Sequence, residues 1–166
     1  MANALIDNSE QFKLVKYIKE LVSRPDCNHI MIATGYWDLP GTALVYEELK
    51  DFFSRGGKLD LLIGQEPQLQ YYQASREAHQ FPDFYIQRDV ESLTDEYKPI
   101  GKLIIDNALT EENPDGKFEI RVYGQGEHKE FLHAKCYIFL GNGLGTGIIG
   151  SSNFTAKGLQ SNAELN

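Results

Sequence analysis

The stretch "EFLHAKCYIFLG", residues 130–141, has the apolar composition of a strand buried in a sheet. It also contains His133 and Lys135, two side chains that are costly to bury and that stand two positions apart. Successive side chains of a strand point to opposite faces, so the two residues are predicted to share one face. Positions 132, 134, 136, 138 and 140 are all apolar, and this opposite face is predicted to rest on the core. The strand would then present an imidazole beside an ammonium group.

The segments before this strand predict an α/β fold. Residues 9–23 carry a helical apolar stripe that Asp7 and Asn8 can cap, and a second helix is expected over 42–54. Two short apolar runs alternate with these helices, "HIMIATGYW" (29–37) and "KLDLLIG" (58–64). This order predicts a β-α-β unit with parallel strands and a right-handed crossover.

The later segments predict further strands around the opening stretch. Residues 65–116 are expected to form a helical layer or a lid, with a helix near 93–104 that Pro99 interrupts. Three strand-like runs follow the turn "NPDG", over 118–124, 131–140 and 146–150. The run "GTGIIG" (145–150) matches a dinucleotide fingerprint only formally, because it is expected to form a strand rather than to open a helix. The glycine-rich residues from 141 are interpreted as a hairpin loop.

Size and charge narrow the possible classes of protein. The 166 residues suit one domain, and no apolar run approaches the roughly 18 residues of a membrane helix. Cys27 and Cys136 lack metal or redox spacing, which favours a reduced, cytoplasmic setting. The net charge of −8 argues against a general nucleic-acid-binding surface. Residues 117–160 nevertheless hold five bases against three acids, a local charge of +2 around the opening stretch.

Three pairs of polar residues share the spacing i, i+2. They are His133 with Lys135, Ser151 with Asn153, and Asn162 with Glu164. Each pair can direct both members to one side of an extended chain. If the three segments are neighbours, an imidazole, an ammonium, a hydroxyl, an amide and a carboxylate converge on one place. Asn162 is left out of the predicted site because it can equally cap or turn the chain.

This set of groups suits the cleavage of a phosphodiester without a metal. A neutral imidazole can attack phosphorus, and a carboxylate on its other ring nitrogen fixes the tautomer. An ammonium with hydroxyl and amide donors neutralises the charge that develops on the non-bridging oxygens. A second acid must protonate the leaving oxygen, and one chain offers no obvious candidate for it.

The order His-x-Lys (133–135), Gly-Ser-x-Asn (150–153) and Asn-x-Glu (162–164) resembles the motif of the phospholipase D superfamily. The resemblance covers 131–166, and "ATGYW…GGKLDLLIG" fits the opening half of that fold loosely. It implies a mixed sheet with helices on both faces, formed by residues 1–166 as a single phospholipase D-like domain. It further implies a nucleophile, a phosphate clamp, two phosphate ligands and a carboxylate that orients the nucleophile. In that order these are His133, Lys135, Ser151, Asn153 and Glu164.

The resemblance also implies the setting in which such a site works. The family's site needs two motifs face to face, so the single motif here implies a homodimer with its site on the two-fold axis. No metal or cofactor is implied. The family's longer signature has Asp five residues after Lys135, where this chain has Leu140. Single-motif nucleases, restriction enzymes and the N-terminal domains of some bacterial helicases resemble this shorter form.

These features together predict a metal-independent nuclease or related phosphodiesterase that works through a phosphohistidine. DNA is the expected substrate, no membrane is expected, and a downstream domain is expected because the chain stops inside an alternating run at 166. A second hypothesis is an inactive module that dimerises and grips nucleic acid through Lys135 and Asn153 for that domain. The acidic net charge and Leu140 favour it. A lipid-headgroup hydrolase or transferase ranks last, because such relatives carry two motifs in one chain.

Overall fold

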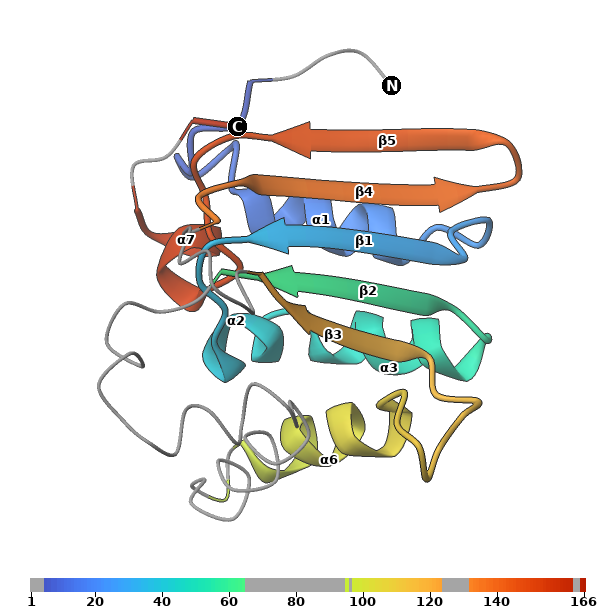
Figure 1. Cartoon of the computed structure of the whole chain (residues 1–166). Helices are drawn as coiled ribbons and strands as arrows, with labels where there is room; N and C mark the ends of the chain where they lie inside the picture. Colours follow the sequence, from blue (N-terminus) through green and yellow to red (C-terminus); the bar gives the residue numbers. More distant parts are fainter. Residues whose placement is uncertain (1–4, 65–94, 96, 124–131, 163–164) are drawn as a thin grey trace.

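The structure is a computed structural model that describes residues 5–64, 95, 97–123, 132–162 and 165–166. The described elements, in chain order, are α1 (Leu14–Val22), β1 (His29–Thr34), α2 (Leu39–Ala43), α3 (Tyr46–Ser54), β2 (Lys58–Ile63), α6 (Lys98–Asn107), β3 (Phe118–Val122), β4 (Lys135–Gly141), β5 (Leu144–Ile149) and α7 (Ala156–Gln160). The five strands form one sheet in the order β3-β2-β1-β4-β5, with the sheet in front of α1 and α3 in Figure 1.

The sheet is mixed, as the resemblance to the phospholipase D superfamily predicts. Strands β1, β2 and β3 pair in parallel, whereas β4 pairs antiparallel with both β1 and β5. The parallel β1 and β2 with α3 between them in sequence confirm the predicted β-α-β unit. Because β4 runs against β1, the start of β4 lies beside the end of β1, where Lys135 pairs with Thr34. This edge of the sheet therefore gathers residues from both ends of the sequence.

The hairpin between β4 and β5 is also as predicted. Its two loop residues, Asn142 and Gly143, have φ angles of 33° and 84°. A two-residue hairpin turn with positive φ at both positions favours the Asn-Gly pair, since these residues tolerate the left-handed region at least cost. The run 145–150 lies on β5 and the loop that follows, so the glycines of "GTGIIG" do not open a helix.

The core lies on the opposite face of β4 from the one predicted. Tyr137 and Phe139 are fully buried on the same face as Lys135, while Cys136, Ile138 and Leu140 on the other face are only half-buried. The prediction was wrong because both faces are apolar apart from Lys135, so alternation did not distinguish them. The rings of Tyr137 and Phe139 fill the space between the sheet and the helices that cover it. The side chains of the other face of β4 point away from these helices.

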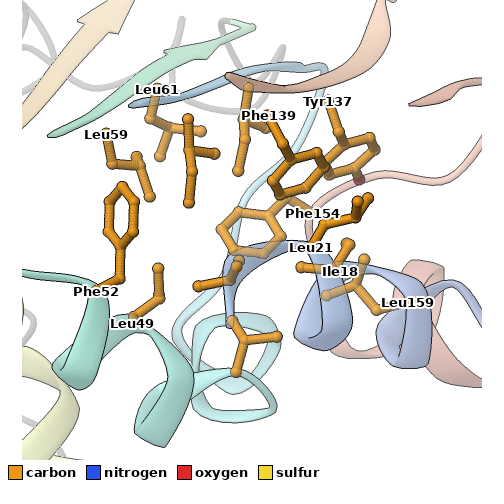
Figure 2. Packing of buried hydrophobic residues seen from close by; sticks show 14 of the residues in the cluster. Ile18, Leu21, Leu49, Phe52, Leu59, Leu61, Tyr137, Phe139, Phe154 and Leu159 are labelled. Atoms are coloured by element: carbon orange, nitrogen blue, oxygen red, sulfur yellow. The ribbon is translucent and has the colours of Figure 1, made fainter. Parts of the chain in front are cut away.

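Helices α1 and α3 lie behind the sheet in Figure 1 and supply the other half of this core. Figure 2 shows Ile18 and Leu21 of α1, and Leu49 and Phe52 of α3, packed towards the side chains of the strands. The ring of Tyr137 meets Phe154 edge-on, with centroids 6.3 Å apart. The core thus extends to the segment that follows β5. Within the described ranges, no helix has the length and apolar character needed to cross a membrane.

Several helix boundaries differ from the predicted ones. Helix α1 begins at Leu14 rather than residue 9, although the side chain of Asn8 still accepts a hydrogen bond from Leu14 N at 2.9 Å. The predicted helix over 42–54 is divided into α2 and α3. Pro99 lies in the first turn of α6, where its missing N–H costs nothing, so it starts this helix instead of interrupting it. Helix α7 was not predicted.

Candidate functional site

Lys135 begins β4, and its side chain lies at the end of the core. The residue is only 4% exposed, and its Nζ donates a hydrogen bond to the backbone oxygen of His133 at 2.9 Å. His133 precedes the strand and is exposed, so the prediction that both residues lie on the strand is wrong. The ammonium group of Lys135 is therefore buried next to the backbone of His133, whereas His133 itself lies at the surface. An ammonium held at the edge of an apolar core has a stronger field than one in water.

Thr34 is the cross-strand neighbour of Lys135 and is completely buried. Its Oγ1 donates to Tyr36 O at 2.8 Å and accepts a hydrogen bond from Phe154 N at 3.0 Å. The Thr34 hydroxyl therefore connects the segment after β1 with the segment after β5. Thr34 was not among the predicted site residues. The available signal was a polar residue at the end of the apolar run "HIMIAT", directly before a glycine.

Asn153 is brought to the same edge of the sheet. Its Oδ1 accepts a hydrogen bond from Tyr36 N at 3.1 Å and lies 3.4 Å from Thr34 Oγ1. The carboxamide oxygen is thus directed at the loop after β1. Its Nδ2 makes no hydrogen bond to the part of the chain that the structure describes. Asn153 therefore offers a ligand a donor rather than an acceptor.

Ser151 follows β5 beside the start of β4. Gly150 N donates to Lys135 O at 3.1 Å, which fixes the distance between the two segments. Ser151 is exposed, and its Oγ accepts a hydrogen bond from Leu165 N at 3.1 Å while its own N donates to Leu165 O at 3.0 Å. The end of the chain is therefore attached to the Gly-Ser-x-Asn segment.

The third predicted pair is described only in part. Glu164 lies outside the described residues, so its place relative to His133 stays a prediction. Asn162 is exposed, and its backbone oxygen accepts a hydrogen bond from Asn8 Nδ2 at 3.1 Å. Asn166 pairs through both backbone groups with Ile6, at 3.0 and 2.8 Å. The N-terminal residues thus hold the described parts of this segment on both sides of position 164.

The structure places Lys135, Ser151 and Asn153 together at the edge of the sheet where β1 ends and β4 begins. In Figure 1 this is the edge near α7. An ammonium and a carboxamide N–H donor are the groups that bind an anion such as a phosphate. Leu140, which replaces the Asp of the family's longer signature, lies far from this site, because it pairs with His29 at the other end of β4. The replacement therefore removes no group from this edge.

A family model described as "Cardiolipin synthase, PLD-like domain" matches residues 18–166. The chain belongs to this phospholipase D-like family. The match spans the strands, the candidate site and the segment that contains Glu164. The resemblance found in the three motifs is thereby confirmed as family membership. Comparison with curated protein sequences gives no match.

Solved structures support the fold of this phospholipase D-like domain. NucT from Helicobacter pylori is similar with a TM-score of 0.54 and 12% identity, over 99% of this chain and 82% of NucT. A polyphosphate kinase from Porphyromonas gingivalis is similar with a TM-score of 0.50 and 12% identity. That match covers 92% of this chain but only 20% of the kinase. At such identities the likeness concerns the fold alone.

Proposed function

We propose that this phospholipase D-like domain is a metal-independent phosphodiesterase that cleaves nucleic acid, with DNA as its expected substrate. Membership of the family supports a phosphodiesterase-type function in general. The observation that carries the finer proposal is the arrangement at the end of β1. The buried ammonium of Lys135 and the donor side of Asn153 flank the same backbone junction, with His133 exposed next to them.

In the proposed reaction, a ring nitrogen of His133 attacks phosphorus. A P–N bond forms while the bond to the leaving oxygen breaks, and that oxygen takes a proton from an acid. Lys135 and the donors of Ser151 and Asn153 stabilise the charge on the non-bridging oxygens. Water then attacks the phosphohistidine, the P–N bond breaks, and His133 is released with a phosphomonoester as the product. Glu164 is proposed to hold the imidazole in the required tautomer.

The acid is proposed to come from a second copy of the chain. A homodimer with the site on its two-fold axis would bring His133 of the partner subunit opposite the nucleophile, where it can protonate the leaving oxygen. The proposal includes a larger DNA-processing protein, such as a helicase or restriction factor, in which this domain is N-terminal. Sedimentation of the chain tests the dimer separately from its activity.

The central experiment is the hydrolysis of labelled single- and double-stranded DNA and RNA by the chain, with and without EDTA. We expect cleavage that EDTA does not affect and that His133→Ala abolishes. Acid-labile, alkali-stable phosphate on the protein after a rapid quench would report the P–N bond. The matched control is His29→Ala, because His29 pairs with Asp60 at 2.8 Å elsewhere on the sheet. Cleavage that survives His133→Ala, or that EDTA abolishes, would contradict the mechanism.

The alternative is a non-catalytic module that dimerises and binds nucleic acid for another domain. The net charge of −8 and the leucine at position 140 favour it. Lys135 and Asn153 would then bind phosphate groups without turnover. Binding that weakens with rising salt, without cleavage of any of the four nucleic acids, would support this function and exclude the first.

A further inference from the structure

Thr34 is a fully buried polar residue whose hydroxyl lies near three groups. Tyr36 O is at 2.8 Å, Phe154 N at 3.0 Å and Asn153 Oδ1 at 3.4 Å. A hydroxyl has one proton to donate, and the shortest contact, with Tyr36 O, takes it. Its lone pairs accept the hydrogen bond from Phe154 N. This oxygen atom therefore joins the loop after β1 to the loop after β5 directly beside Asn153, whereas the next link, from Asp38 N to Phe154 O at 3.3 Å, lies further along both loops.

The Thr34 hydroxyl affects both the backbone and the side-chain carboxamide of Asn153. Phe154 N, which Thr34 holds, belongs to the peptide directly after Asn153. Tyr36 N, in the residue whose carbonyl Thr34 also holds, donates to Asn153 Oδ1 at 3.1 Å. The backbone and the carboxamide oxygen of Asn153 are thus set through one hydroxyl. Because Oδ1 is committed to Tyr36, Nδ2 is the atom that remains for a ligand.

We propose that Thr34 is a positioning residue that fixes the carboxamide of Asn153 as a donor to a phosphate oxygen. This inference rests on the proposed phosphate site. Without the hydroxyl, Phe154 N and Tyr36 O lose their shared partner on the two sides of Asn153. The hydrogen bond from Asp38 N to Phe154 O still joins the two loops, but the carboxamide of Asn153 is held less firmly and rotates more easily. A rotated carboxamide would present its oxygen to the anion, which repels it. Thr34 therefore controls phosphate affinity without touching phosphate.

The test uses three Thr34 variants and a matched control in the full chain. Thr34→Val keeps the shape and removes the hydroxyl, and Thr34→Ser keeps a hydroxyl. Thr34→Ala removes the hydroxyl without placing a methyl group against Tyr36 O and Phe154 N, and it serves if the valine variant does not fold. Thr42→Val is the control. Thr42 is 3% exposed, and its Oγ1 accepts from Trp37 Nε1 at 2.8 Å and contacts Asp38 O at 3.2 Å. Thr42→Val therefore removes a buried hydroxyl with two polar contacts, as Thr34→Val does, but Thr42 does not hydrogen-bond to Asn153.

Two readouts are measured for each variant. One is the hydrolysis of bis(p-nitrophenyl) phosphate, and the other is the shift of the Asn153 side-chain amide signal when inorganic phosphate is titrated. We expect Thr34→Val and Thr34→Ala to raise KM and the apparent Kd for phosphate about tenfold, which corresponds to one hydrogen bond to a charged group. Thr34→Ser and Thr42→Val should leave both constants within about twofold.

The outcomes separate this inference from the proposed function. Hydrolysis by the original chain with unchanged constants in Thr34→Val would overturn the role of Thr34 and leave the function intact. An equal loss of affinity in Thr42→Val would show a general structural effect and also overturn it. A chain that binds phosphate at Asn153 without hydrolysis would keep the inference and contradict only the catalysis. A chain that does neither would contradict both.

Discussion

Replacement of Lys135 by methionine should separate activity from stability. The ammonium is buried at 4% exposure, and its described hydrogen bond goes to the backbone oxygen of His133 at 2.9 Å. Taking an ammonium out of water costs several kcal/mol, and the polar contacts of a buried charge often do not return this cost in full. Methionine has a similar length and is apolar, so it can follow the same path through the core edge. Such a residue is expected where function, rather than stability, requires the charge.

The magnitude follows from the contacts. Each hydrogen bond that the charged donor loses in Lys135→Met, such as the one to His133 O, costs about 1.5–3 kcal/mol, and the variant regains the desolvation cost of the ammonium, which is several kcal/mol. Because His133 is exposed, its backbone oxygen can turn to water. We therefore expect the free energy of unfolding to stay within about 1 kcal/mol of the original or to rise. Turnover should fall about 10²- to 10³-fold, as when one charge-stabilising donor is removed from a transition state.

The assay pairs urea unfolding with hydrolysis of bis(p-nitrophenyl) phosphate. The matched control is Lys117→Met, because Lys117 Nζ also donates to a backbone oxygen, that of Phe53, at 2.8 Å. Lys117 lies just before β3, away from the candidate site, so its variant should lose about 1 kcal/mol of stability and retain its turnover. A variant Lys135→Met that is destabilised by more than about 2 kcal/mol and still turns over would refute the reasoning.

Three further predictions concern stability and reactivity. Tyr137→Phe removes the hydrogen bond from the buried hydroxyl to Ser152 O at 2.7 Å. It should cost about 1–2 kcal/mol in urea unfolding, and a neutral result would show that water replaces the bond. Asn8 has a φ of 60° and makes three side-chain hydrogen bonds. Asn8→Ala should therefore destabilise by about 2–3 kcal/mol and Asn8→Gly by less, and equal losses would show that backbone strain is unimportant there. Burial raises the pKa of the Cys27 thiol, so at any pH it has less thiolate than an exposed cysteine. Thiol labelling should modify the half-buried Cys136 first, with Cys27 reacting at higher pH, and the reverse order would contradict this assignment.

The local elements of the fold were accessible from the sequence because their signals are local. The apolar runs predicted all five strands within a few residues, and the glycine-rich residues from 141 predicted the hairpin. Residues at which two local signals compete were less predictable. Asp38 caps a separate short helix α2, since its side chain accepts a hydrogen bond from Gly41 N at 2.6 Å, and this helix therefore begins at Leu39, before the expected start at 42. The expected helix is then interrupted after Ala43, and α3 begins at Tyr46. Proline at 99 is compatible with both a break and a start.

The order of the strands and the choice of the buried face were decided by tertiary packing. Alternation along β4 predicted the face of Cys136, Ile138 and Leu140 as the core face, but packing against α1 and α3 buries the face with Tyr137 and Phe139. The same selection explains why Lys135 is buried. The sequence signal of Thr34 was weak, because a threonine at the end of a strand is common and its importance comes from a loop 120 residues later.

The sequence by itself determined the family and the chemical identity of the candidate site. His-x-Lys, Gly-Ser-x-Asn and Asn-x-Glu are read from residue types and spacing, which need no coordinates. Only the tertiary structure decided that β4 runs antiparallel beside β1, which brings Lys135 next to Thr34 and, through it, Asn153. The physical reason is that spacing along a chain sets which face a side chain occupies. The partners of that face are set by packing between segments far apart in the sequence.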